Sequence, residues 1–129
     1  MPRAARTLMF ALLSLLPAPA LASEGGAASV VPVAELRVPI LDAGRFAGTL
    51  RVQSALDYAD PAESKVATER APELRAAALA AGLEFARLHV SALAPIDAAL
   101  LSQALTRPAR SIDPHVRRVL ILDVSARQP

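Results

Sequence analysis

Four arginines near the end of the chain are the side chains whose type and spacing best suit binding chemistry. A guanidinium group keeps its charge at all ordinary pH values and donates several hydrogen bonds, so a cluster of them is suited to holding a carboxylate or a phosphate. We predict that this cluster contacts an anionic surface, a lipid head group or an acidic partner. The simpler alternative is a solvated loop whose charge Asp113 partly neutralises. The four candidate residues are Arg107, Arg110, Arg117 and Arg118.

A second group of arginines falls within one predicted hairpin. Arg37, Arg45 and Arg51 would line up across its two strands. They either form a second anionic contact or protect a sheet edge by their charge.

Catalytic and metal-binding groups are sparse. The chain has 2 histidines and no cysteine, and His89 and His115 do not have the spacing of a metal-ligand pair. His89 is expected near the end of a helix, where a cation suits the helix dipole. No serine stands in a recognisable nucleophile motif. We therefore expect a non-enzymatic protein with no catalytic residue, metal or cofactor.

One alternative keeps a small-molecule site open. A periplasmic ligand-binding protein, or an enzyme with an unrecognised site, would need polar groups that converge on a pocket. The sequence offers Tyr58, His89 and Arg51 for that role.

The first 22 residues have the order of a secretory signal peptide. Arg3 and Arg6 precede an apolar run over 8–16, and Ala20-Leu21-Ala22 forms a small-residue cleavage site. The run is shorter than the ~20 residues that cross a bilayer. We predict export to the periplasm, cleavage after Ala22 and no integral membrane span in the mature protein. The alternative is a signal retained as a weak membrane anchor.

Charge and composition exclude one class of partner. Arg3 and Arg6 account for the whole net charge of +2, so the predicted mature chain is formally neutral, and aromatic residues make up only 3%. Because nucleic-acid affinity depends mainly on neutralising phosphates, we expect no nucleic-acid binding. With no cysteine to form disulfides, apolar packing must hold the fold.

The elements that must position these side chains begin with a hairpin. Residues 23–32, with paired glycines, predict a flexible lead-in, and 33–129 predict one domain. Alternating apolar residues predict strands over 33–42 and 46–58 around a glycine turn. Pro39 cannot donate to a ladder, which favours an edge position or a bulge.

Three helices and a last strand follow. Asp60 is placed to cap a helix over 61–70, and Asp97 to cap one over 98–106 that ends before Pro108. The strand at 116–127 is apolar on both faces, which is typical of a central or doubly covered strand. The longest helix, over 72–90, carries an apolar stripe formed by Leu74, Ala78, Ala81, Phe85 and Leu88.

These elements predict an α+β domain. A small three-stranded, mostly antiparallel sheet, made of the hairpin and the C-terminal strand, is covered on one face by two to three helices. A hairpin alone is marginal in water, so the helices must cover its apolar face.

The same order of elements resembles the periplasmic domain of the flagellar basal-body-associated FliL family. The resemblance rests on Thr-Leu-Arg-Val-Gln-Ser-Ala-Leu at 49–56, Ala-Pro-Glu-Leu-Arg-Ala-Ala-Ala-Leu at 71–79 and the closing strand at 116–125. It implies a non-enzymatic scaffold that self-associates and contacts membrane-protein partners beside the flagellar stator. Family members are held by a transmembrane helix, whereas the segment here is short and cleavable. No functional residue of the family can be matched to a position of this chain.

Overall fold

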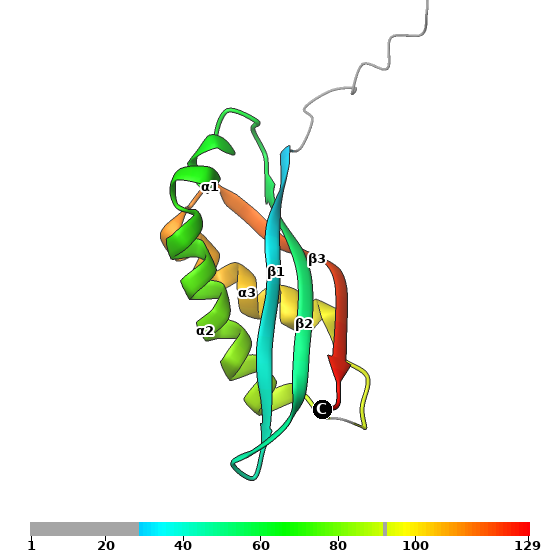
Figure 1. The fold of residues 1–129 in the computed structure, drawn as a ribbon. Helices are drawn as coiled ribbons and strands as arrows, with labels where there is room; N and C mark the ends of the chain where they lie inside the picture. Colours follow the sequence, from blue (N-terminus) through cyan, green and yellow to red (C-terminus); the bar gives the residue numbers. More distant parts are fainter. Residues whose placement is uncertain (1–28, 92) are drawn as a thin grey trace, which may run out of the picture.

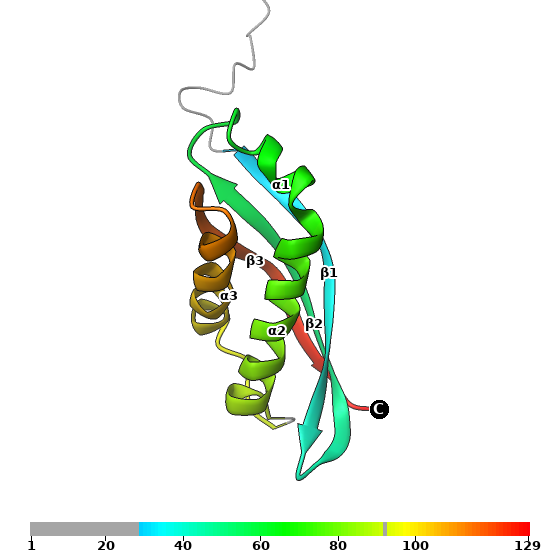
Figure 2. The same cartoon turned by 90° about the vertical axis from the view of Figure 1, so that its left-hand side faces the viewer.

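A sheet of three antiparallel strands backed by helices forms the domain in the computed structural model, which describes residues 29–91 and 93–129 (Figure 1). The strands lie in the order β1-β2-β3, and the helices all lie on one face of the sheet (Figure 2). This arrangement confirms the predicted α+β fold. The elements are β1 (Ser29–Asp42), β2 (Arg45–Tyr58), α1 (Lys65–Glu69), α2 (Ala71–His89), α3 (Ala98–Ile112) and β3 (Val116–Arg127).

The predicted hairpin of β1 and β2 is confirmed, with a longer first strand. Ala43 and Gly44 turn the chain with φ values of 49° and 77°, a conformation that glycine adopts without strain. β1 begins at Ser29, so the predicted flexible lead-in is wrong for residues 29–32. These residues join the sheet because Val31 pairs with Leu56 and packs against the core. The predicted signal peptide and the rest of the lead-in lie outside the described residues.

The core lies between the sheet and the helices. Inward-facing residues of β1 and β2 alternate with exposed ones, as a half-buried sheet requires. α2 packs very closely against β1 at Gly82. A Cβ atom added at this glycine would lie only 3.0 Å from the Cγ2 atom of Val38. The glycine therefore permits this close packing. The largest fully buried apolar side chains and Tyr58 form the centre of the core: Leu50, Leu101, Val38, Val52 and Val116.

The long helix α2 follows the predicted stripe except at its end. Pro72 lies in the first turn, and both Leu74 and Phe85 are buried. Leu88, however, is 56% exposed, so its predicted place in the core is wrong. It borders a groove of about 420 Å³ between α2 and α3, which the two helices leave unfilled.

Two helix boundaries differ from the prediction. The carboxylate of Asp60 accepts the N–H of Ala62 at 2.9 Å and caps a turn, while α1 itself begins at Lys65. α3 begins after Asp97 as predicted, since that carboxylate accepts the N–H of Leu100 at 3.0 Å. It then continues through Pro108 to Ile112, so the predicted end before Pro108 is wrong. Burial of Ala109 beyond the proline helps to offset the lost hydrogen bond.

The last strand, β3, is an edge strand with the described helices on one face of the sheet only, so the predicted central or doubly covered position is wrong (Figure 2). The apolar residues on the second face of β3 are not all buried in the folded domain. A register shift between Gln53 and Ser54 leaves Leu122 outside the pairing, where it is 61% exposed. The other edge is β1, as Pro39 predicted.

Candidate arginine site

Three of the four predicted arginines line one hollow on the surface. Arg107 and Arg110 come from α3 and Arg118 from β3, and together they border an open hollow of about 570 Å³. Arg117 is exposed but does not line it. We call this hollow the arginine basin. Its other lining residues are Ser102, Gln103, Thr106 and Ser111.

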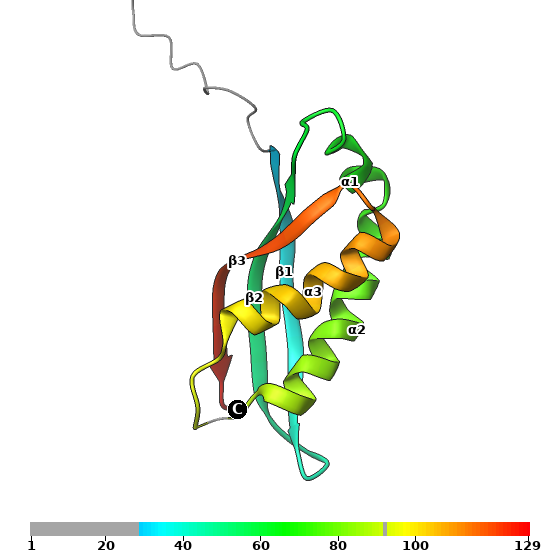
Figure 3. The ribbon, with the colours of Figure 1, turned by 180° about the vertical axis from the view of Figure 1, so that it is seen from behind.

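The amphipathic pattern of α3 brings the two helical arginines to the surface. Leu101, Leu105 and Ala109 are buried, and these positions share one side of the helix. Arg107 and Arg110 therefore fall on the outward side, three residues apart, where their side chains are neighbours. Figure 3 shows α3 crossing the helix-covered face of the sheet beside α2.

A buried hydrogen bond holds the end of α3 in place. The Tyr58 hydroxyl donates to Oδ2 of Asp113 at 2.8 Å, and the N–H of His115 donates to Oδ1 of the same carboxylate at 3.1 Å. Burial, followed by the bond to Asp113, raises the pKa of the Tyr58 hydroxyl. The Arg70 guanidinium also donates to the carbonyl of Ile112. Asp113 is 1% exposed, so it anchors the helix and does not serve as the surface counter-charge of the arginines.

Hydroxyl groups of α3 attach the helix to the edge of β3. The Oγ1 atom of Thr106 accepts the N–H of Val119 at 2.9 Å, and the Ser102 hydroxyl donates to the carbonyl of Val119. The Thr106 hydroxyl in turn donates to the carbonyl of Ser102 at 2.6 Å. Because these hydroxyl protons are already used, a bound anion would depend on the guanidinium groups and the amide of Gln103.

The basin carries uncompensated positive charge. Arg118 places Nε 3.2 Å from Oδ2 of Asp57, whose side chain is only 5% exposed. Across residues 29–91 and 93–129, no ion pair is found for Arg107 or Arg110. Like charges three residues apart on a helix cost a few tenths of a kcal/mol. A bound anion would relieve that repulsion, which makes the basin a candidate anion site.

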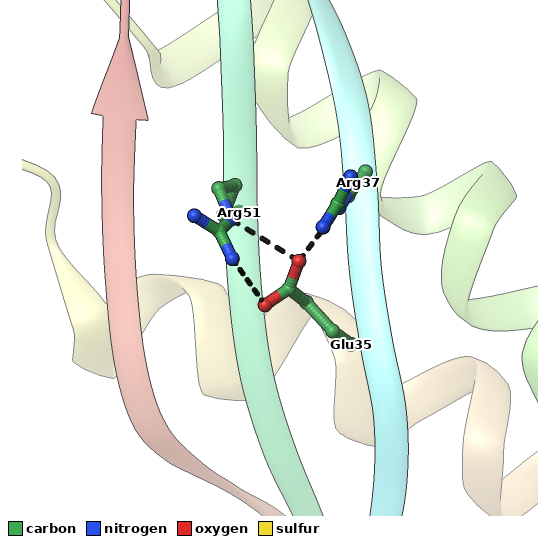
Figure 4. Close-up of polar contacts among 3 residues, drawn as sticks. All are labelled: Glu35, Arg37 and Arg51. Atoms are coloured by element: carbon green, nitrogen blue, oxygen red, sulfur yellow. Dashed lines mark hydrogen bonds and ion pairs between the residues drawn. The ribbon is translucent and has the colours of Figure 1, made fainter.

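The hairpin arginines form a different arrangement. Arg37 and Arg51 stand opposite each other on β1 and β2, and both bond to the carboxylate of Glu35 (Figure 4). Arg51 reaches Oε2 at 2.7 Å and Oε1 at 3.1 Å, and Arg37 reaches Oε1 at 2.7 Å. Arg45 pairs with Asp42 at the far end of the hairpin and does not join them. Sequence reasoning missed Glu35, which partly neutralises the pair.

Glu35 gives the fold a defined acid dependence. Hydrogen bonds from Arg51 and then Arg37 lower the pKa of its carboxyl to about 2, from an ordinary value of 4.5. The carboxylate therefore stabilises the fold above the ordinary pKa, and this contribution is lost as the pH falls from about 4.5 to about 2. We expect the melting temperature of Glu35→Gln to fall less across this window than that of the original chain. Glu69→Gln, at an exposed position in α1, is the control, and parallel curves for all three proteins would contradict the assignment.

The residues offered for a small-molecule site are not brought together. Tyr58 is buried in the core, while Arg51 lies with Glu35 on the face of the sheet opposite α1, α2 and α3 (Figure 4). His89 is the last residue of α2, as predicted, with its ring centroid 5.1 Å from that of Phe85.

His115 occupies the loop before β3, also as predicted. Its imidazole is 56% exposed, and Nδ1 lies 3.1 Å from Oε1 of Glu63. This contact joins the loop to the turn that precedes α1.

The part of the chain that the structure describes contains neither a metal site nor a membrane-crossing helix. Within the described ranges there is no cluster of three or more His, Cys, Asp or Glu residues suited to a metal ion. Nor does any helix in that part of the chain have the length and apolar character needed to cross a membrane. No protein-family model matches the chain, and no curated protein matches it either.

Proposed function

We propose that this protein is an exported, non-enzymatic binding and structural module of the periplasm. Its arginine basin holds an acidic segment of a partner protein. The observation that carries the proposal is the pair Arg107 and Arg110, fixed side by side on α3 at the border of a hollow of about 570 Å³.

The shape of the site favours a protein partner over a lipid surface. A bilayer is flat on this scale, whereas a hollow admits a projecting side chain. A carboxylate that enters it accepts charge-assisted hydrogen bonds from two guanidinium groups, each contributing about 1.5–3 kcal/mol. The anchored ends of α3 support binding, because the helix backbone that carries the two arginines is already in position when the partner arrives.

Binding of a fluorescent hexaglutamate peptide at low ionic strength tests the proposal. Replacing Arg107→Gln together with Arg110→Gln is expected to weaken binding at least tenfold, which corresponds to a loss of about 1.4 kcal/mol. Salt should weaken binding to the original chain, since screening acts on exposed charges.

The matched control removes two arginines outside the basin. Arg45→Gln with Arg117→Gln changes the net charge equally and should alter the affinity less than twofold. An equal loss of peptide affinity in both double variants would show that binding depends on net charge and not on the basin, and would overturn the proposal. Binding to phosphatidylglycerol vesicles is measured as well. If the protein binds the vesicles but not the peptide, the basin is a site for a lipid surface and the proposal of a protein partner is wrong.

Export and a flagellar role are further parts of this proposal. The N-terminal signal pattern supports export, and a mature terminus at Ser23 in the secreted protein would establish cleavage after Ala22 and exclude an anchor. The resemblance to the FliL family supports an accessory role with self-association and a membrane-protein partner at the flagellar base. Loss of swimming on gene deletion would support that role, and unchanged swimming would count against it.

The alternative of a small ligand-binding protein or enzyme has less support. Its three candidate residues lie in different places, and Tyr58 bonds to Asp113 inside the core.

A further inference from the structure

The two edges of the sheet differ in their capacity to accept another strand. On β1, Pro32 and Pro39 pair with Ala55 and Thr49 of β2. The backbone groups of Val119 in β3, which is opposite Leu56 of β2, bond to α3, so Leu56 must direct its own backbone groups toward β1. Backbone direction alternates along a strand, so Ala55 and Thr49 point toward β3, and both prolines occupy outward positions on the β1 edge. A proline has no N–H to offer to an incoming strand, and this edge is therefore blocked.

On the outer edge of β3, backbone hydrogen-bonding groups in the first half already bond to α3. Those in the second half are available to another strand. The N–H and C=O of Val119 point away from β2 and are bonded by Thr106 and Ser102 of α3. Along a strand, the N–H and C=O groups of successive residues point alternately toward one neighbour and the other. The register shift at Leu122 adds one unpaired residue, so outward-pointing groups belong to odd-numbered residues before it and to even-numbered residues after it. Val124 and Ala126 therefore present their backbone groups outward. The stretch 122–127 contains no proline, and among the described residues no further strand lies beyond it in the sheet (Figure 3).

The side chains of residues 122–127 are complementary to those of the same residues in a second copy of the chain. In an antiparallel pairing of two copies centred on Ser125, Val124 meets Ala126 of the second copy, and Asp123 meets Arg127. Asp123, Ser125 and Arg127 alternate along the strand and share the helix-free face, since Ser125 pairs with Arg51. Opposite charges directly across a strand pair are favourable, and here the contact occurs twice. A pairing centred on Asp123 would instead oppose two carboxylates.

We propose that residues 122–127 of β3 pair with the same residues of a second copy. The dimer has two-fold symmetry, and its axis passes between the two Ser125 residues and runs perpendicular to the sheet. The two sheets become one continuous sheet, with the helices of both copies on the same face. The contact is short, so the dimer is weak and forms with rising concentration. It does not use the arginine basin and goes beyond the binding role proposed above.

Disulfide trapping tests the pairing, because the chain has no cysteine of its own. The two Ser125 residues form a non-hydrogen-bonded pair with Cα atoms about 4.5 Å apart, which suits a disulfide. In the full chain under mild oxidation, Ser125→Cys is expected to form dimers at least tenfold faster than Gln53→Cys. Gln53 is a matched control, since it is exposed on the same face but lies on the central strand.

Charge reversal then tests the register. Asp123→Arg or Arg127→Asp alone, combined with Ser125→Cys, should slow cross-linking, and the two reversals together should restore it. Equal cross-linking of Ser125→Cys and Gln53→Cys, or no recovery in the double reversal, would overturn the proposal.

A mixing experiment covers the case in which Ser125→Cys fails to fold. Asp123→Cys and Arg127→Cys, mixed as separate proteins, should form mixed dimers faster than either forms dimers alone. Purely self-paired products would overturn the proposal. Because the basin variants leave this edge unchanged, cross-linking should persist in Arg107→Gln/Arg110→Gln, which separates this result from the outcome of the peptide-binding experiment.

Discussion

Phe85→Asp is expected to unfold the domain. Phe85 is 2% exposed and packs in the core between α2 and the sheet. Removing a buried phenylalanine side chain costs about 3–5 kcal/mol, and an unpaired carboxylate in its place adds a desolvation penalty. Domains of this kind are stable by only about 5–15 kcal/mol, so the substitution removes most or all of the stability. Loss of helical circular dichroism and of a cooperative melting transition is the expected result.

Leu88→Asp is the matched control for that experiment. Leu88 lies three residues further along α2, on the same apolar stripe, but is 56% exposed. The new carboxylate stays in water there, so the melting temperature should change little. A wild-type midpoint for Phe85→Asp, or an equally large loss for Leu88→Asp, would mean that the rotational position of α2 is different from the one described.

Asp113→Ala is expected to have the next largest effect. It removes the acceptor for both the Tyr58 hydroxyl and the N–H of His115. The hydroxyl stays buried without a partner, and the two losses together should cost about 3–4 kcal/mol, measured by urea unfolding. Asp97→Ala removes an exposed helix cap and should cost only about 1 kcal/mol.

A double-variant cycle separates this bond from simple packing. Tyr58→Phe leaves the carboxylate of Asp113 buried with one partner fewer and should destabilise the fold by about 2 kcal/mol. Once Asp113→Ala is present, Tyr58→Phe should cost much less, because no acceptor is left for the hydroxyl. Additive losses would show that the two side chains act independently. The anchoring of α3, and with it the position of the basin arginines, would then need another explanation.

Local features predicted most of the secondary structure. The alternation in β1 and β2, the glycine turn and the Asp97 cap depend on residues close together in the chain, and each lies within a residue or a few of its predicted place. Pro108 shows the limit of this reasoning. Proline at an internal helix position is unfavourable by itself, and the burial of Leu101, Leu105 and Ala109 of α3, which exists only in the folded domain, offsets that cost.

The candidate site was predicted in composition but not in geometry. The sequence placed four arginines near one loop, and α3 and β3 bring Arg107, Arg110 and Arg118 to one hollow while Arg117 stays outside it. In the alternative interpretation of a solvated loop, Asp113 partly neutralises these charges, yet it is buried against Tyr58. That partner lies on a distant strand, so no local pattern indicates the contact.

The order of strands and helices, their apolar faces and the arginine-rich character of the C-terminal region follow from the sequence, because each depends on residue type and short-range spacing. Folding alone assigned β3 to an edge, turned Asp113 inward and placed Glu35 between two arginines. These outcomes depend on which residues meet across the sheet and the helix layer. Such contacts join residues far apart in the chain, where one-dimensional spacing carries little information.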